Sequence, residues 1–166
     1  MASTAQTDII LDAVVAALSD IDVTNTYEGG ANYRTTVETV SRTLRYPNSV
    51  ESSDRPALYV GGVEPARLQW RSGERFFGDW RLAVHGYIPT KKSDGTVYTE
   101  SQQDDFSHDL RADVIAAIAK DIRLGGVCIY CLPEETDASE GRPKDADDGW
   151  IGVMLNVKWY GSRSVQ

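Results

Sequence analysis

The first regular spacing of apolar residues along the chain is helical. Ile10, Val14 and Leu18 recur four residues apart, with acidic and small polar residues between them. Thr7 precedes them and offers a hydroxyl that can cap the first turn. The pattern predicts an amphipathic helix over residues 7–21.

Several stretches with the composition or alternation of β-strands follow. Residues 22–30 favour a short strand that ends at two glycines, and the β-branched residues of 33–46 favour another. Residues 57–63 form a compact apolar strand. Two more stretches, 66–72 and 75–88, are separated by Gly73 and predict a hairpin.

The longer strand of this hairpin has two distinguishable faces. A strand directs successive side chains to opposite faces of its sheet. One set combines aromatic and aliphatic residues with a glycine, and we expect it to be buried: Trp80, Leu82, Val84, Gly86 and Ile88. The other set is mixed in character: Arg81, Ala83, His85 and Tyr87.

The helical spacing returns over residues 101–122. Phe106, Leu110, Val114, Ala117 and Ile118 form its apolar stripe. Thr99 and Gln102 have the spacing of a capping box. Gly125 and Gly126 are expected to end this helix, because glycine adopts the left-handed cap conformation at low cost.

The end of the chain predicts two further strands. Residues 127–132 are rich in β-prone residues, residues 133–149 form a polar acidic loop, and residues 150–160 alternate again. Strands clustered between two helices predict an α+β fold, with a mainly antiparallel β-sheet and both helices packed on one face. We expect a single domain over residues 1–166, with 28–56 and 133–149 as variable extensions.

Composition and charge narrow the class of protein. The 166 residues are 41% hydrophobic and 25% charged, as in an ordinary globular domain. The formal net charge of −8 argues against binding of nucleic acid by neutralisation of its phosphates. It is compatible with a surface that DNA passes without adhering, because like charges repel. No apolar run approaches the ~18 residues of a membrane span. The first residues do not have the pattern of a signal peptide, so synthesis in the cytoplasm is expected.

Cys128 and Cys131 have the C-x-x-C spacing of a redox dithiol or half of a zinc site. If both lie in the strand predicted over 127–132, their side chains point to opposite faces, so they cannot share a metal or pair readily as a disulfide. We therefore interpret them as reduced cysteines that serve as small apolar or surface residues. No cofactor or metal is expected.

Acidic residues form the remaining candidate sites. Asp105, Asp109 and Asp113 recur at helical spacing, which indicates a solvated acidic face or a surface for a basic partner. Residues 145–149, Asp-Ala-Asp-Asp-Gly, hint at a calcium loop, but position twelve is Asn156 and the glycine stands at position five. An acidic loop tip and a weak cation site both remain open. The chain has no phosphate-binding, nucleophile-elbow or zinc-protease motif, so an enzyme is not expected.

The order of these segments resembles the tail terminator (minor tail, tail completion) proteins of tailed bacteriophages. The resemblance lies in the opening helix DIILDAVVAALSDI, the strand RPALYVGG, the strand FFGDWRLAVHGYI, the helix end IAKDIRLGG and the last strand GWIGVMLNVKWY. It implies a structural virion protein that forms a ring, a homohexamer, on the finished tail tube and stops its growth. Its partners would be further copies of itself, the tail tube protein and the head connector at the head-proximal end of the tail. DNA would pass through the ring without specific binding, and no membrane would be involved.

Two sets of charged residues are hypotheses within this interpretation. One set is acidic and is a candidate for lining the lumen or docking a partner: Asp105, Asp109, Asp113, Glu134, Glu135, Asp137, Asp145, Asp147 and Asp148. Arginines are candidates for contacts between subunits: Arg34, Arg42, Arg45, Arg67, Arg71 and Arg75. The alternatives are a head–tail joining protein and a small cation-binding regulatory domain.

Overall fold

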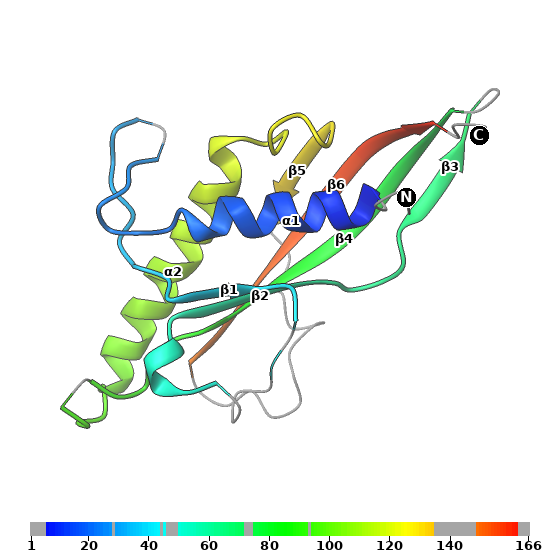
Figure 1. The fold of residues 1–166 in the computed structure, drawn as a ribbon. Helices are drawn as coiled ribbons and strands as arrows, with labels where there is room; N and C mark the ends of the chain where they lie inside the picture. The colour runs from blue at the N-terminus through cyan, green and yellow to red at the C-terminus, as the bar shows by residue number, and fades with distance from the viewer. Residues whose placement is uncertain are drawn as a thin grey trace.

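The computed structural model describes residues 6–27, 29–43, 45, 50–71, 75–92, 94–134 and 149–162. These residues form two α-helices, a short 3₁₀ turn and six strands (Figure 1). In chain order the elements are α1 (Gln6–Ser19), β1 (Thr39–Ser41), η2 (Ser52–Asp54), β2 (Ala57–Gly62), β3 (Arg67–Trp70), β4 (Arg75–Tyr87), α2 (Glu100–Lys120), β5 (Tyr130–Pro133) and β6 (Trp150–Ser162).

The six strands form one sheet, in which five follow the order β1-β2-β4-β6-β5 and β3 pairs with β4 off this path. β1 is parallel to β2 and all other pairs are antiparallel. β4 and β6 pair along their whole lengths, from Arg75 opposite Ser162 to Tyr87 opposite Trp150. β2 pairs with the second half of β4, and β3 pairs with the first half. The β4–β6 pair is therefore the longest strand pair of the sheet, and the other strands pair with one of its two members or with β2.

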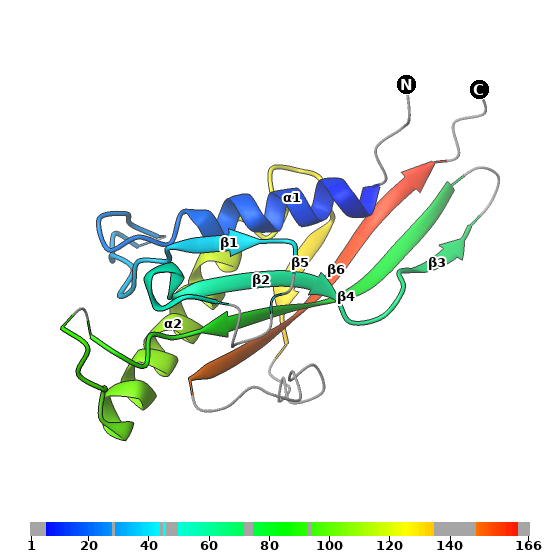
Figure 2. The same ribbon diagram turned by 60° about the horizontal axis from the view of Figure 1, so that its bottom comes forward.

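Both helices pack on one face of this sheet (Figure 2). Ile10, Val14 and Leu18 of α1 and Leu110 and Ile118 of α2 share a single buried cluster with that face. The sheet supplies alternate residues to the same cluster, as the alternation predicts: Leu82, Val84, Ile151, Val153, Leu155, Val157 and Trp159. The expected α+β architecture is confirmed.

The opposite face of β4 departs from the expected mixed character over its second half. Ala83, His85 and Tyr87 are all buried. Tyr87 packs with Tyr59 and Val50 in a small second cluster, and the His85 ring lies 6.0 Å from that of Trp150. Both faces of the sheet are thus covered at this end of the molecule.

The region before β2 holds less strand than its composition predicts. Residues 22–30 contain turns and one isolated bridge from Thr26 to Asn32, and within 33–46 only Thr39–Ser41 is described as a strand. β-branched residues favour a strand only where a partner strand is available. Here Thr35 instead donates its hydroxyl to Asp113 of α2 at 2.7 Å.

Both ends of α2 can be compared with prediction. The capping box is confirmed, because the Gln102 amide donates to the Thr99 hydroxyl at 3.3 Å and the Gln102 side chain accepts from the Thr99 amide at 3.1 Å. The expected end at Gly125 and Gly126 is wrong, since the helix ends at Lys120 and Asp121 caps it. The two glycines, with φ of +69° and +89°, instead turn the chain back toward β5.

The cysteines do not point to opposite faces as predicted. β5 begins at Tyr130, so Cys128 lies before the strand, and both residues are buried in the main core. Both are free thiols, and burial raises their pKa values to about 11 and about 12. Raised pKa values oppose the thiolate form that redox or metal chemistry requires. In the part of the chain that the structure describes, neither helix has the length and apolar content needed to cross a bilayer.

Candidate assembly interface

Three strand segments extend beyond the helices and form what we call the arm. It consists of residues 67–71, 75–80 and 158–162, which belong to β3 and its end, the first half of β4 and the end of β6. Figures 1 and 2 show it projecting at the end of the molecule farthest from the start of α2. All four residues of β3 are exposed.

Aromatic rings lying on glycines hold the arm together on its helix-facing side. A Cβ atom on Gly78 would lie 2.1 Å from the ring of Trp159, which stands directly opposite it on β6. A Cβ atom on Gly161 would lie 2.0 Å from the ring of Phe76, its partner on β4. The two rings occupy the space that side chains would otherwise fill, so the thin ribbon is stiffened where no helix supports it.

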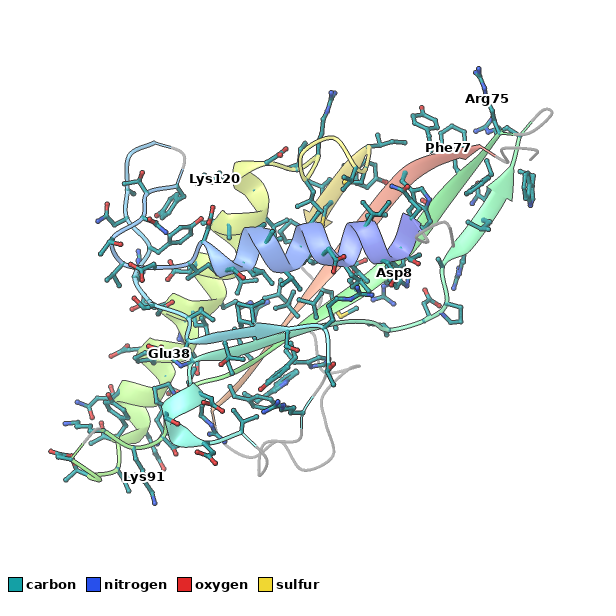
Figure 3. All side chains as sticks on the ribbon, in the orientation of Figure 1. Asp8, Glu38, Arg75, Phe77, Lys91 and Lys120 are labelled. Carbon is teal, nitrogen blue, oxygen red and sulfur yellow. The ribbon has the colours of Figure 1, made fainter. Side chains whose placement is uncertain are left out.

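On the other face, Phe77 is the centre of a cluster of aromatic and basic side chains (Figure 3). Its ring centroid lies 4.5 Å from that of Tyr160. The Arg71 guanidinium and the Lys158 ammonium lie 5.1 and 5.6 Å from the same centroid, within the range of cation–π attraction. Lys158 also forms an ion pair with Asp79 at 3.6 Å.

The outer edge of β3 is unpaired among the described residues. The Arg71 amide donates to the Arg75 carbonyl at 3.0 Å, and hydrogen-bonded pairs alternate along an antiparallel ladder. Gln69 and Arg67 therefore direct their backbone groups toward β4, whereas Leu68 and Trp70 direct theirs away from it. Such an edge is a template for another strand.

Large apolar side chains accompany this open edge. Leu68 and Trp70 of β3 are 49% and 55% exposed; Tyr160, 66% exposed, lies across β4 on β6 and on the other face of the arm. Trp70 packs against Phe76, with ring centroids 5.1 Å apart. Exposed aromatic and aliphatic side chains grouped beside an unpaired edge are typical of a surface that another macromolecule covers.

The arm carries a net positive charge although the chain as a whole is negatively charged. It carries Arg67, Arg71, Arg75 and Lys158 against the single acid Asp79, while the net charge of the chain is −8. Its partner is therefore favoured to be acidic.

In the described structure, the outer edge of β5 has, by contrast, few backbone groups left to pair with another strand. The Cys131 amide donates to the Ile122 carbonyl at 2.6 Å, and Pro133 has no amide hydrogen. Among the described residues of this edge, the two groups most suited to pair with another chain are thus already occupied or missing. β3 is the better candidate for strand addition.

The structure separates the six candidate arginines into two groups. Arg67, Arg71 and Arg75 come together on the arm, where Arg67 also pairs with Glu64 at 2.9 Å. Arg34 pairs with Asp109 at 2.7 Å, and Arg42 pairs with Asp8 and Asp12 of α1. Arg45 is exposed and its carbonyl accepts a hydrogen bond from the Tyr87 hydroxyl.

The two half-buried or buried acidic candidates of α2 have partners inside the chain. Asp113 is 2% exposed, so its place in an exposed acidic stripe is wrong. Its carboxylate accepts hydrogen bonds from the Arg34 and Thr35 amides and from the Thr35 hydroxyl, at 2.7 to 2.9 Å for the closer oxygen. Asp109 is half-buried and paired with Arg34.

The other acidic candidates are exposed, paired or undescribed. Asp105 is exposed. Glu134 accepts from Arg81 at 3.2 Å on the face of the sheet opposite the helices. Glu135, Asp137, Asp145, Asp147 and Asp148 lie outside the described residues, as does the possible cation loop at 145–148. Among the described residues, no three His, Cys, Asp or Glu side chains gather as metal ligands would.

Sequence reasoning identified the arginines of the arm but missed its aromatic residues. The density of aromatic residues in RFFGDW (75–80) and KWYG (158–161) was an available signal. No family model matches the chain, and its sequence matches no curated protein.

Proposed function

We propose that this protein is a structural subunit of a phage tail, a tail terminator that forms a ring on the finished tube, ends its polymerisation and provides the interface to the head connector. The observation that carries the proposal is the arm. It combines a strand edge that has no partner among the described residues, exposed Leu68 and Trp70, and a basic charge on an acidic chain.

An arm of this kind suits a subunit that is completed by assembly. An unpaired and partly apolar edge is a liability in a protein that remains alone, because it promotes aggregation. The same edge is useful where a partner adds to it and buries the apolar side chains. The resemblance of the order of elements to tail terminators supports the particular assembly.

Electron microscopy of phage lysates tests the proposal. Without this protein, we expect tails of abnormal length, and supplying the wild-type chain restores the normal length. A chain carrying Leu68→Asp and Trp70→Asp fails to restore it, because two charges stand where a partner would bury apolar groups. Leu132→Asp is the matched control, since Leu132 is similarly exposed (42%) but lies on the closed edge of β5.

The other outcomes identify the alternatives. Tails of normal length that fail to join heads would overturn the terminator in favour of a head–tail joining protein. Normal virions, together with a melting temperature that rises on adding calcium, would favour the cation-binding domain.

A further inference from the structure

A groove of about 440 Å³ lies at the end of the molecule opposite the arm. It is lined by Val97 and Tyr98 from the hairpin before α2, and by Glu100, Gln103, Asp104 and Ser107 from the first turns of α2. Figure 3 labels Lys91 on this hairpin and Arg75 and Phe77 on the arm, at opposite ends of the molecule.

The groove offers the arm three complementary features. Val97 is 64% exposed and supplies an apolar surface. Glu100 and Asp104 supply carboxylates. The third feature is a backbone edge. The Tyr98 amide donates to the Thr90 carbonyl and the Lys92 amide donates to the Thr96 carbonyl. The backbone groups of Val97, between these two bonds, therefore point away from the hairpin.

The groove has charges of both signs, and its carboxylates lie on the side formed by α2. Lys92 lies over the ring of Tyr98, 5.6 Å from its centroid, and so takes a position on the rim. The carboxylates of Glu100 and Asp104 come from α2 itself. On the arm, Trp70 packs on Phe76 on one face and Arg71 lies over Phe77 on the other, so the apolar face can meet the hairpin while the basic face meets the carboxylates of α2.

We propose that the arm of one copy docks into this groove of the next copy, so that copies of the chain join head to tail. Trp70 and Leu68 cover Val97, Arg71 and Arg75 pair with Glu100 and Asp104, and the β3 edge meets the backbone of Val97. This contact specifies the interface of the ring proposed above, and the inference rests on that proposal. Two unlike surfaces at opposite ends of a subunit generate a closed ring when the rotation between successive copies closes.

A second copy fits the arm better than other occupants. Two arms are both basic and would repel each other, which opposes a symmetric arm-to-arm contact. Nucleic acid could use the arm's arginines and aromatic rings, but the chain as a whole carries −8 and repels phosphate. An acidic groove on the same chain supplies the opposite charge without a further component.

Mixing of two variants tests the contact on the full chain. The arm variant carries Trp70→Asp and Arg75→Glu, and the groove variant carries Glu100→Lys and Asp104→Lys. In analytical ultracentrifugation we expect the wild type to form higher oligomers as concentration rises, and each variant alone to stay monomeric. An equimolar mixture should give dimers and nothing larger, because each variant keeps one functional surface.

Two controls separate this contact from general effects of charge or misfolding. Asp105→Lys alters an exposed acid next to the groove without lining it, and should assemble like the wild type. A chain carrying both Arg75→Glu and Asp104→Arg reverses the charges on both surfaces and should recover oligomers that either single change abolishes. Circular dichroism confirms that each variant is folded.

Three results would overturn the contact. The first is a wild type that stays monomeric up to about 1 mM, the concentration at which even a contact of ~4 kcal/mol is half formed. The second is a groove variant that assembles like the wild type. The third is a pair of variants that do not associate on mixing. Tail length is measured separately, so a failed contact together with abnormal tails would leave the terminator standing with a different interface. Normal tails would overturn the proposed function itself.

Discussion

The carboxylate of Asp113 joins α2 to the segment that leads into β1. It is buried and accepts hydrogen bonds from two backbone amides and one hydroxyl, which belong to Arg34 and Thr35. Backbone amides that are buried need an acceptor, and a carboxylate that serves several of them at once is hard to replace. Asp113 therefore fixes residues 34 and 35, which belong to no strand in the described structure.

Replacing Asp113 tests this role. Asp113→Ala leaves the donors of Arg34 and Thr35 without their acceptor, and we expect the free energy of unfolding to fall by about 2–4 kcal/mol. Asp105→Ala, on the exposed side of the same helix, should cause no measurable change. Urea denaturation followed by circular dichroism measures both. Equal stabilities for the two variants would contradict the role assigned to Asp113.

His85 makes the stability of the fold depend on pH. Burial lowers the pKa of its imidazole, and its Nδ1 atom has no hydrogen-bond partner among the described residues. Its strand partner Tyr59 offers no negative charge near pH 7, because burial raises the pKa of a phenol that is already neutral there. Protonating His85 would place an unpaired cation between covered strands.

The sign of the dependence follows from the lowered pKa. The unfolded chain binds the proton below about pH 6.5, whereas the folded chain resists it, so stability is complete above this pH and declines as the pH falls toward the lower folded value. We expect the midpoint of urea unfolding to fall between about pH 7.5 and 5.5. His85→Phe should flatten the decline, and His108→Gln, which removes the exposed histidine, should leave it. A decline unchanged in His85→Phe would refute the assignment.

At the scale of elements, the β4–β6 ribbon depends on glycines placed opposite aromatic rings. Trp159 lies over Gly78 and belongs to the buried core, and Phe76 lies over Gly161 at the tip of the arm. The pairs join the core to the arm along one face of the ribbon. The arm keeps its shape without a helix because these rings fill the space above the backbone.

A methyl group at Gly78 is the direct test. Gly78→Ala places a Cβ atom 2.1 Å from the Trp159 ring, and we expect the forced repacking to lower the free energy of unfolding by about 1–3 kcal/mol. Gly61→Ala is the matched control on β2, where nothing lies within 4 Å of the new atom. Gly61→Ala should be neutral or slightly stabilising. Thermal unfolding distinguishes the two, and a neutral Gly78→Ala would contradict the close packing described.

At the scale of the whole molecule, charge is distributed unevenly along the long axis. Basic residues gather on the arm at one end, and acidic residues of α2 line the groove at the other. A chain with opposite charges at its two ends favours ordered head-to-tail contacts over random ones, because wrong arrangements bring like charges together.

Salt concentration probes this distribution. We expect self-association of the wild type to weaken several-fold between about 50 and 500 mM sodium chloride, since exposed charge pairs are screened over this range. The variant with reversed charges on both surfaces should show the same dependence. Association that strengthens with salt would instead indicate a contact dominated by apolar burial.

The sequence by itself determined the elements with regular periodicity and therefore the fold class. The stripes of α1 and α2 and the alternation in β4 and β6 predicted the core-facing residues, of which Phe106 and Trp80 are only half-buried, because a helix and a strand each repeat on a fixed period. The capping box at Thr99 was equally local and equally readable. The sequence also identified Arg67, Arg71 and Arg75 as candidates for contacts between subunits. It did not show that they lie together on the arm.

Only the tertiary structure decided which residues share a surface. Asp113 had the spacing of an exposed acid, but the segment at 34–35 packs over it, and Cys128 joins Cys131 in the core because the strand begins later than its composition predicts. The arm exists because β4 and β6 extend beyond the helices that cover them. That difference in length becomes visible only once the strands are paired. Local patterns set the elements, while contacts between residues distant in sequence set the surface on which the proposed assembly depends.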